Sequence, residues 1–327
     1  MSKVSVALTT YNGEKYILKQ LHSLLFQRRA IDEVIIFDDA STDKTVEIIK
    51  DFIEKNHLVN WHFFRNRKTR GFAKNFNNAI KKTTGDIIFL CDQDDIWYKT
   101  KIGAMLNRFE SDERIKAIYS SFTFIDENDN LLRTRTKLAH SNNNLIKFRV
   151  EPFETVKIDL ETICSYNISP GCTLAFTKEV RDIYLERTQS TCVHDWELAS
   201  IAAFMDGLYF FNTPLTNYRI HSDNTIGLPE LVGKNSALQR ASYENRLDKA
   251  QQIDNYFKAM QVYEDLLDEK GREIVNEKAK FIAKRLEALT EKKVAKIIDL
   301  YKNDNRHYST AVTLKGRLAD IFCVLKK

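Results

Sequence analysis

The first 110 residues alternate short apolar segments with amphipathic segments, and this alternation restricts the fold more than any other feature of the chain. The apolar segments predict buried strands, and apolar side chains recurring at three- and four-residue spacing between them predict helices. The predicted strands are Val4–Leu8, Val34–Phe37, Trp61–Phe64 and Ile87–Cys91. Three helices are predicted. The first begins near Tyr16, the second begins after a cap at Ser41 or Asp43, and the third covers Phe72–Ile80. Because strands linked through helices pair in parallel, the sequence predicts an α/β fold with a Rossmann-like, mostly parallel sheet and flanking helices.

Polar side chains follow three of these predicted strands at the point where each strand ends. Thr9–Asn12 follows the first strand, Asp38 and Asp39 follow the second, and Asp92–Asp95 follows the fourth. The carboxyl ends of parallel strands share one edge of a sheet, and ligands of α/β proteins bind at that edge. The sequence therefore predicts one binding site that these three clusters form together.

The segment Asp92-Gln93-Asp94-Asp95 holds three carboxylates in four positions. Like charges this close repel one another unless a cation lies between them. Hard oxygen ligands suit Mg²⁺ or Mn²⁺ that is shared with a phosphate-bearing substrate. The alternative is a solvated acidic turn after a strand, because short motifs also occur by chance.

The composition suits a globular protein of the cytoplasm. The 327 residues include five cysteines without Cys-x-x-Cys spacing, so we expect neither disulfides nor a zinc site, in keeping with a reducing compartment. The chain begins with a strand-like segment in place of a signal peptide, and no apolar run reaches the roughly 20 residues of a membrane span. We expect a soluble protein, or one held peripherally on the inner face of the plasma membrane.

Charge is distributed unevenly along the chain. Residues 1–227 hold 30 Lys and Arg against 30 Asp and Glu, whereas residues 228–327 hold 20 against 15. The basic residues of the second part alternate with acidic ones along predicted helices, which is typical of solvated helix faces. We therefore do not expect this chain to bind nucleic acid.

Four motifs, in matching order and spacing, resemble those of family 2 glycosyltransferases of the GT-A fold. They are Thr9–Glu14, Asp38–Thr45, Arg70–Asn75 and Asp92–Asp95. Two later segments, Val193–Glu197 and Tyr218–Gly227, resemble the bacterial branch that contains rhamnosyltransferases of cell-wall and surface polysaccharides.

The resemblance covers about residues 3–227 and implies a GT-A catalytic domain at 1–227. Its nucleotide half is expected at about 1–110 and its acceptor half at about 111–227. Residues 228–327 are expected to form a separate helical region, because Pro and Gly are nearly absent there.

The activity that the resemblance implies is inverting, metal-dependent glycosyl transfer. We expect rhamnose to move from dTDP-rhamnose onto a cell-wall or surface polysaccharide acceptor that is linked to a lipid. One alternative is the same fold with a UDP-sugar, such as UDP-glucose, UDP-galactose or UDP-GlcNAc. Another is a protein that binds nucleotide sugars without catalysis.

The resemblance also assigns roles to individual residues. It implies that Asp94 and His221 hold Mn²⁺ or Mg²⁺ and that Asp195 is the base that deprotonates the acceptor hydroxyl. For His221 the alternatives are contact with the diphosphate or a structural role, and Arg219 is the alternative phosphate partner. The residues expected to bind the nucleotide and its diphosphate are Thr9, Tyr11, Asn12, Asp39, Arg70, Asn75, Asp92 and Gln93.

The second half of the predicted catalytic domain leaves further alternatives open. Asp195 is also suited to cap a predicted helix at Trp196–Met205. His194 either orients Asp195, contacts the acceptor or packs in the core. Gly171, before a predicted strand at Cys172–Phe176, is expected where the backbone passes close to a sugar.

The predicted C-terminal helices are amphipathic. The last one, Thr313–Lys327, places Leu314, Leu318, Ile321, Phe322 and Leu325 on one face, with four basic residues and one acidic residue around it. A basic amphipathic helix of this kind lies on anionic membranes in many proteins. The alternatives are packing against the helical region or against a second copy of the chain.

Overall fold

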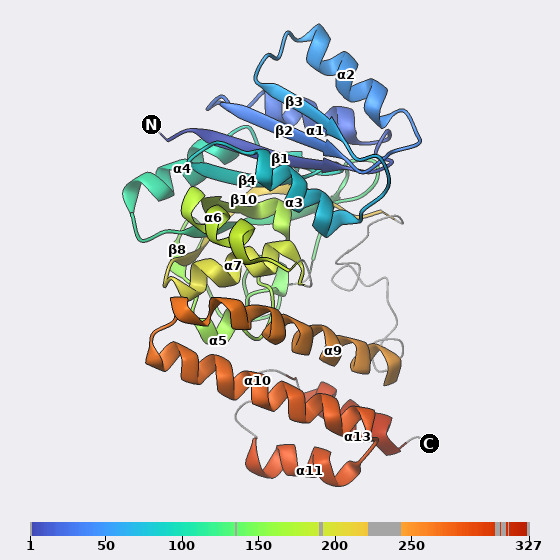
Figure 1. The fold of residues 1–327 in the computed structure, drawn as a ribbon, viewed down its shortest axis with the longest axis vertical. Helices are drawn as coiled ribbons and strands as arrows, with labels where there is room; N and C mark the ends of the chain where they lie inside the picture. Colours follow the sequence, from blue (N-terminus) through green and yellow to red (C-terminus); the bar gives the residue numbers. More distant parts are fainter. Residues whose placement is uncertain are drawn as a thin grey trace.

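The computed structural model describes residues 2–134, 136–189, 192–221, 243–304, 308, 312 and 314–325. A sheet occupies the upper half of the molecule, and a stack of helices extends below it (Figure 1). Residues 222–227 of the predicted Tyr218–Gly227 motif, the predicted domain boundary at 227, and Thr313, Lys326 and Lys327 lie outside the described residues. No helix among the described residues is long and apolar enough to cross a membrane.

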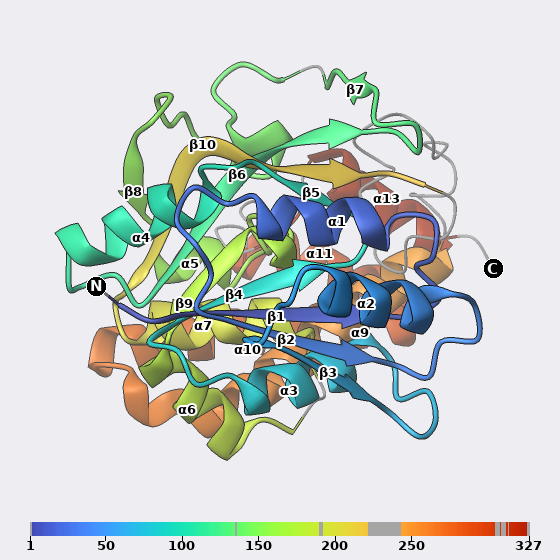
Figure 2. The same ribbon diagram turned by 90° about the horizontal axis from the view of Figure 1, so that it is seen from above.

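The strands form a ten-stranded sheet, with eight of them in the order β3-β2-β1-β4-β9-β6-β10-β5 (Figure 2). The strands β1 to β4 pair in parallel, and β10 pairs in parallel with β6, whereas β9 joins the two groups antiparallel to its neighbours. The described strands are β1 (Val4–Thr10), β2 (Glu33–Asp38), β3 (Trp61–Arg65), β4 (Ile87–Asp92), β5 (Ile96–Trp97), β6 (Ala117–Ile125), β7 (Leu131–Leu132), β8 (Thr155–Lys157), β9 (Leu174–Thr177) and β10 (Leu208–Arg219).

The longer helices fall into a group from the first half of the chain and a group that follows β9. They are α1 (Ile17–Leu25), α2 (Thr45–Lys55), α3 (Phe72–Lys82), α4 (Lys101–Ser111), α6 (Lys178–Arg187), α7 (His194–Phe204), α9 (Tyr243–Met260), α10 (Glu269–Thr290), α11 (Val294–Asn303) and α13 (Leu314–Leu325). The short helices are α5 (Leu160–Ile163), η1 (Asn142–Asn144), η2 (Gly171–Thr173) and η3 (Gln261–Leu266).

Alternation along the strands assigns each side chain to one of two cores. In β1, Val4, Val6 and Leu8 pack with the apolar faces of α1, α2 and α4, whereas Ala7 packs on the opposite face with α3, α6 and α7. Successive side chains of a strand point to opposite faces, so a strand buried on both faces needs a continuous apolar run. The predicted mostly parallel sheet with flanking helices is confirmed.

The C-terminal helices continue the second core below α7 (Figure 1). The ring of Tyr256 in α9 stacks on Trp196 in α7, with 4.0 Å between the ring centroids. Deeper in the stack, the fully buried carboxylate of Asp320 pairs with the guanidinium groups of Arg246 and Arg285 and accepts a hydrogen bond from the Tyr308 hydroxyl. Apolar stacking thus attaches the helical region to the sheet, and one buried ion network joins α9, α10 and α13.

Some local predictions differ from the structure. Cys172 belongs to the 3₁₀ turn η2, and β9 begins only at Leu174. The strands β6 and β7 pair antiparallel as a hairpin whose turn includes residues 127–130. The helix expected to begin at Trp196 begins at His194, with Val193 at its N-cap, so the capping role considered for Asp195 is wrong.

A candidate active site at the carboxyl edge of the sheet

The register of the parallel strands brings the predicted polar clusters to one edge. Thr9 of β1 lies beside Asp92 of β4, and on the other side Thr10 of β1 lies beside Asp38 of β2. Thr10 Oγ1 donates a hydrogen bond to Asp38 Oδ2 at 2.9 Å. The three loops that leave these strands are thereby held next to one another.

Asp94 and His221, predicted from the resemblance as a pair of ligands, are in contact. The Nε2 atom of His221 lies 2.8 Å from Oδ2 of Asp94, although the two residues are far apart in the sequence. His221 directly follows the end of β10, and its ring packs 4.9 Å from the ring of Tyr16. The structure therefore brings a carboxylate and an imidazole together at this edge.

Arg219, considered above as a phosphate partner, is instead buried beneath this pair. Its Nε donates to the backbone carbonyl of Asp94 at 2.7 Å, and its backbone amide donates to Asp95 Oδ1 at 3.0 Å. Its Nη1 is also 2.6 Å from the carboxylate of Asp129 in the β6–β7 turn. The side chain has no exposed surface, so Arg219 holds the acidic loop from below and does not reach toward solvent.

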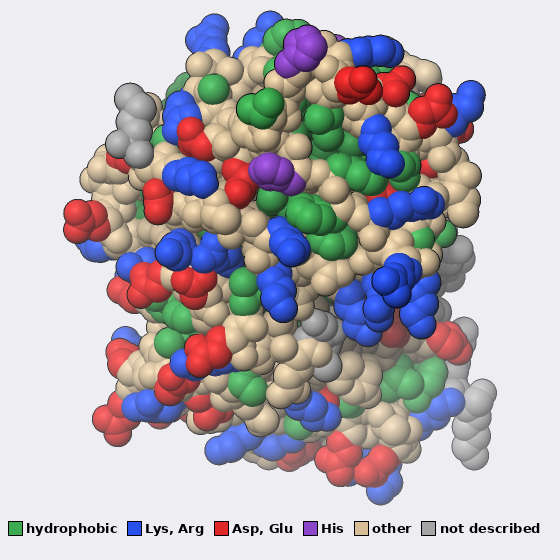
Figure 3. Space-filling model, turned by 45° about the horizontal axis from the view of Figure 1, so that its top comes forward, with side chains coloured by type: hydrophobic (Ala, Val, Ile, Leu, Met, Phe, Trp, Pro, Cys, Tyr) green, Lys and Arg blue, Asp and Glu red, His purple; other side chains and the backbone are tan. Residues whose placement is uncertain are grey.

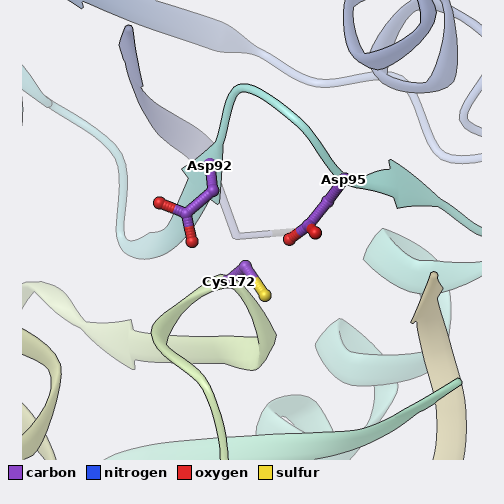
Figure 4. A group of neighbouring side chains, drawn as sticks. All are labelled: Asp92, Asp95 and Cys172. Carbon is purple, nitrogen blue, oxygen red and sulfur yellow. The ribbon is translucent and has the colours of Figure 1, made fainter. Parts of the chain in front are cut away.

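Asp92 and Asp95 point toward the same space above Cys172 (Figure 4). One ligand atom from each of these three residues lies within 4.8 Å of the other two. Burial and then the charge of Asp94 raise the pKa of Asp95 to about 7, and the buried Oδ2 of Asp95 has no hydrogen-bond partner among the described residues. Desolvation and then the charges of Asp95, Asp94 and Asp195 raise the pKa of Asp92.

This set of donors fits a hard divalent cation. Carboxylate oxygens and one imidazole are ligands that Mn²⁺ and Mg²⁺ accept, and positive charge offsets the burial and the repulsion that raise the pKa values of Asp92 and Asp95. Cys172 is a softer donor, and burial raises the pKa of its thiol well above the usual value, so it is a poor ligand for such a cation. The residues present therefore suit the predicted metal as two neighbouring donor groups: Asp94 with His221, whose ligand atoms lie 2.8 Å apart, and Asp92 with Asp95, whose oxygens lie within 4.8 Å of each other.

Lys101 lies fully buried below the acidic loop, and the sequence did not point to it. Its ammonium donates to the backbone carbonyl of Cys172 and to Thr216 Oγ1 and lies 3.8 Å from the ring of Trp97. Burial lowers its pKa to about 8, against the opposing influence of Cys172 and the nearby carboxylates. A lone lysine in the first turn of a helix carries no local signal, because its importance arises only from the tertiary position.

The loop after β1 is held by side chains that were predicted to bind the nucleotide. The amide of Gln93 pairs with the backbone of Tyr11, accepting from its N–H at 2.8 Å and donating to its carbonyl at 2.9 Å. Asn12 Oδ1 accepts from the backbone amide of Thr42 at 2.8 Å. The side chain of Tyr11 itself is 48% exposed, so its ring remains available for stacking.

Asp39 and Asn75 lie at the same edge but are buried. The carboxylate of Asp39 accepts from the backbone amides of Arg70 and Gly71 and from Asn66 Nδ2. Asn75 Nδ2 donates to the carbonyl of Phe37 at 2.8 Å. Both side chains therefore hold the start of α3 against the sheet, and among the predicted residues of this motif only Arg70 extends into solvent, where it lines a shallow polar hollow with Lys74.

Asp195, the predicted base, lies in the first turn of α7 and is buried. Its Oδ1 accepts from the backbone amide of Trp196 at 2.7 Å, and its Oδ2 accepts from Asn167 Nδ2 at 3.2 Å. Burial raises the pKa of Asp195 to about 6. A Cβ atom on Gly171 would lie 3.0 Å from Asp195 Oδ2, so the backbone of Gly171 lies close to this carboxylate, and its approach to a sugar stays a prediction.

His194 packs and makes no hydrogen bond to Asp195. Its ring stacks on Phe76 with 4.1 Å between centroids, and neither ring nitrogen has a hydrogen-bond partner among the described residues. Burial lowers the pKa of His194 to about 3, so the ring is neutral. Of the three roles considered, the structure supports packing.

Residues 5–165 match the family described as Glycosyl transferase family 2. The chain is 29% identical to dTDP-rhamnosyl transferase RfbG of Shigella flexneri, over 67% of this chain and 73% of that protein. It is 30% identical to chondroitin synthase of Escherichia coli, over 39% of this chain and 18% of that protein.

Two solved structures share the fold. S. aureus TarS in complex with UDP-GlcNAc superposes with a TM-score of 0.54 at 17% identity, over 94% of this chain and 91% of that chain. The mannosyltransferase PcManGT of Pyrobaculum calidifontis, in complex with GDP-Man and Mn²⁺, gives a TM-score of 0.50 at 17% identity, over 99% of this chain and 87% of that chain. At this identity the likeness establishes the architecture alone.

Proposed function

This chain is a family 2 glycosyltransferase with the GT-A fold, and from that premise we propose that it transfers rhamnose from dTDP-rhamnose to a surface polysaccharide by an inverting, metal-dependent reaction. The observation that carries the mechanism is the convergence of Asp92, Asp94, His221 and Asp195 at one edge of the sheet. Asp195 is close enough to the acidic loop that its charge raises the pKa of Asp92. A group that activates an acceptor would thus adjoin the groups that bind a diphosphate.

The acidic loop is proposed as the diphosphate side of the site. Asp94 and His221 would hold Mn²⁺ or Mg²⁺, which stabilises the negative charge of a departing nucleoside diphosphate. Arg219 keeps the loop in place from below through its hydrogen bond to the carbonyl of Asp94, and Lys101 holds the facing turn η2 through its hydrogen bond to the carbonyl of Cys172. The exposed ring of Tyr11 is positioned to stack on the nucleoside base, and Thr9 and Asp92 line the space between base and diphosphate. Arg70 is proposed to contact a phosphate.

Asp195 is proposed as the base. Inversion at the anomeric carbon requires that the acceptor hydroxyl lose its proton as it attacks, and a carboxylate within hydrogen-bond reach accepts that proton. A pKa of about 6 keeps Asp195 ionised at neutral pH while bringing its basicity closer to the working pH than that of an exposed aspartate. The protonated base then releases the proton to solvent after the product leaves.

The proposed donor, dTDP-rhamnose, is assigned from sequence similarity. Sequence similarity over 73% of a dTDP-rhamnosyl transferase favours dTDP-rhamnose, whereas TarS and PcManGT were solved with UDP-GlcNAc and GDP-Man. The test is donor hydrolysis measured across dTDP-rhamnose, UDP-glucose, UDP-galactose, UDP-GlcNAc and GDP-mannose with Mn²⁺ or Mg²⁺. Turnover of dTDP-rhamnose at least tenfold above the rest supports the proposal, and preference for a UDP-sugar replaces it with the alternative donor class.

We also propose that α13 places the enzyme on an anionic membrane, where a lipid-linked acceptor would be met. Leu314, Leu318, Phe322 and Leu325 recur at helical spacing and are 46–65% exposed, whereas Asp320, Cys323 and Val324 pack inward. One side of α13 therefore packs against the rest of the protein, and another, apolar side is exposed. Both ribbon views place α13 toward the side to which β1–β3 point, so this helix and the carboxyl edge of the sheet lie toward the same side of the molecule (Figures 1 and 2).

Charge favours a lipid surface as the occupant of this face. Lys315 and Arg317 flank it, the one acidic residue of α13 is buried against arginines, and the last hundred residues carry the net positive charge of the chain. By contrast, acidic and basic side chains are interspersed over the face shown in Figure 3. Each Lys or Arg near an anionic surface contributes about 1 kcal/mol, and each buried apolar side chain about 1.5–3 kcal/mol.

Co-sedimentation with vesicles containing phosphatidylglycerol tests this proposal. The double variant Leu318→Glu, Phe322→Glu should lose more than tenfold in vesicle binding, most clearly at low salt. The control is Val59→Glu, which alters a fully exposed apolar side chain far from α13 and should bind as the wild type does. If the double variant instead changes only the oligomeric state in size-exclusion chromatography, the face is an interface between two copies of the chain.

A further inference from the structure

We propose that Asn167 and Tyr119 are positioning residues that set the orientation and the proton affinity of Asp195. Neither belongs to a motif that the sequence singled out. The inference rests on the proposed role of Asp195 as base, and it concerns how that base is prepared for catalysis.

The three residues form a chain of hydrogen bonds that starts in the sheet. The hydroxyl of Tyr119, fully buried in β6, donates to Asn167 Oδ1 at 2.9 Å and lies 3.3 Å from the backbone carbonyl of Asp195. Asn167, in the segment between α5 and η2, then donates from Nδ2 to Asp195 Oδ2 at 3.2 Å. The side-chain amide of Asn167 thus links Tyr119 of the sheet to the carboxylate of Asp195.

Tyr119 determines which way that amide faces. The Tyr119 hydroxyl donates its one proton to Asn167 Oδ1 at 2.9 Å, which is nearer than the backbone carbonyl of Asp195 at 3.3 Å, so the oxygen of the Asn167 side chain faces Tyr119. The amide NH₂ must then face Asp195. The hydrogen bond from Tyr119 thus favours the orientation in which Asp195 meets a donor, whereas the reversed amide would place its oxygen against the Asp195 carboxylate.

A donor at this position favours the ionised carboxylate. Burial raises the pKa of Asp195, whereas the hydrogen bonds from Trp196 and Asn167 lower it. Among the described residues, the charge of Asp195 also acts on Asp92 of β4, Tyr184 of α6 and Cys192, and none of these groups carries positive charge. Asn167 is thus a side-chain donor whose hydrogen bond lowers the pKa of Asp195 against the effect of burial. The neutral ring of His194 makes no hydrogen bond to Asp195.

The hydrogen bond from Asn167 also restricts the orientation of the Asp195 carboxylate. Oδ1 of Asp195 accepts a hydrogen bond from the amide of Trp196, and Gly171 lies so close on the other side that a Cβ atom there would come within 3.0 Å of Oδ2. With Oδ2 held by Asn167, rotation of the carboxylate is restricted to one orientation. Loss of this restraint reduces the fraction of time in which the base is aligned.

The test measures kcat and donor KM from pH 5 to pH 8 for the full chain and its variants. Asn167→Ala should lower kcat roughly tenfold, leave donor KM within about twofold, and move the acidic limb of the kcat profile up by about one pH unit. Asn167→Asp keeps the shape but replaces the donor by an acceptor, so it should move the limb further. Tyr119→Phe should act in the same direction, and adding it to Asn167→Ala should change little, because both act through one amide.

Asn142→Ala is the matched control. Asn142 is buried beside the same segment and bonds to Ser121 and Ile168, with no contact to Asp195. It should reduce thermal stability without moving the acidic limb. If Asn167→Ala behaves like Asn142→Ala, its role is structural and the inference is wrong. Asp195→Asn in the same assay distinguishes failure of the proposed base from failure of the positioning role. If Asp195→Asn retains turnover, Asp195 is not the base. If Asp195→Asn is inactive but the acidic limb of Asn167→Ala does not move, only the positioning role of Asn167 is refuted.

Discussion

Replacement of Gly171 by alanine tests whether the space around Asp195 is as tightly filled as the structure indicates. The added Cβ would lie 3.0 Å from both Cβ and Oδ2 of Asp195 and 3.3 Å from its Cγ. Ordinary van der Waals contacts are longer, so either η2 or the first turn of α7 must move by a few tenths of an ångström. The backbone of Gly171 does not have positive φ, so the expected effect is steric and not conformational.

The size of the effect follows from this displacement. Overpacking of this kind costs about 1–3 kcal/mol of stability. A misplacement of 1 Å in a catalytic group can lower the rate on the order of a hundredfold, so a shift of a few tenths should lower kcat roughly tenfold. Donor affinity should change little, because Gly171 adjoins the proposed base and not the proposed nucleotide site.

Steady-state kinetics with saturating donor, combined with urea unfolding, measures both quantities. Gly103→Ala is the matched control: it lies in α4, and its nearest neighbour would be Arg29 Cβ at an ordinary 3.7 Å. That change should raise stability by up to about 1 kcal/mol and leave kcat unchanged. Wild-type kcat in Gly171→Ala, with only stability reduced, would refute the argument that Asp195 is held in place by close packing.

Three further predictions follow from other parts of the molecule. Asp94→Asn should reduce transfer by more than tenfold and weaken Mn²⁺ binding in calorimetry without lowering Tm, and retention of over a tenth of the rate would remove Asp94 as a ligand. Transfer should fall as pH decreases through about 6, the pKa of Asp195, because protonation removes the base, and a rate constant down to pH 5 would contradict this assignment. Asp320→Asn should destabilise the chain by about 3–5 kcal/mol in urea unfolding, since Arg246 and Arg285 would lose their buried anion, and a change below 1 kcal/mol would show that the network contributes little.

The sequence allowed the sheet and its binding edge to be predicted because both depend on local patterns. Apolar runs such as Val4–Leu8 and Ile87–Cys91 are buried on both faces in β1 and β4, and such runs are recognisable without tertiary information. The acidic loop could be placed at the edge of the sheet for the same reason. The proximity of Asp94 and His221 was different, since it depended on a family resemblance and not on spacing.

The hydrogen-bond partners within the site could not be predicted, because they depend on how loops meet in space. Asp39 and Gln93 have the chemistry of ligand-binding residues, and nothing in the sequence indicates that backbone amides of neighbouring loops occupy them. Lys101 and Asn167 show the converse. Each is an unremarkable residue in sequence, and each gains its importance by being brought against Cys172 or Asp195 from a distant segment.

The most direct test of the proposed mechanism is a comparison of donor binding and turnover in Asp195→Asn. The substitution preserves the size of the side chain and removes its ability to accept a proton. The mechanism predicts that calorimetry with Mn²⁺ and dTDP-rhamnose gives a Kd within about twofold of the wild type, while transfer falls by roughly 10²–10⁴-fold. Donor affinity that collapses while turnover at saturation persists would contradict it, because Asp195 would then be a residue that binds the donor and not the base.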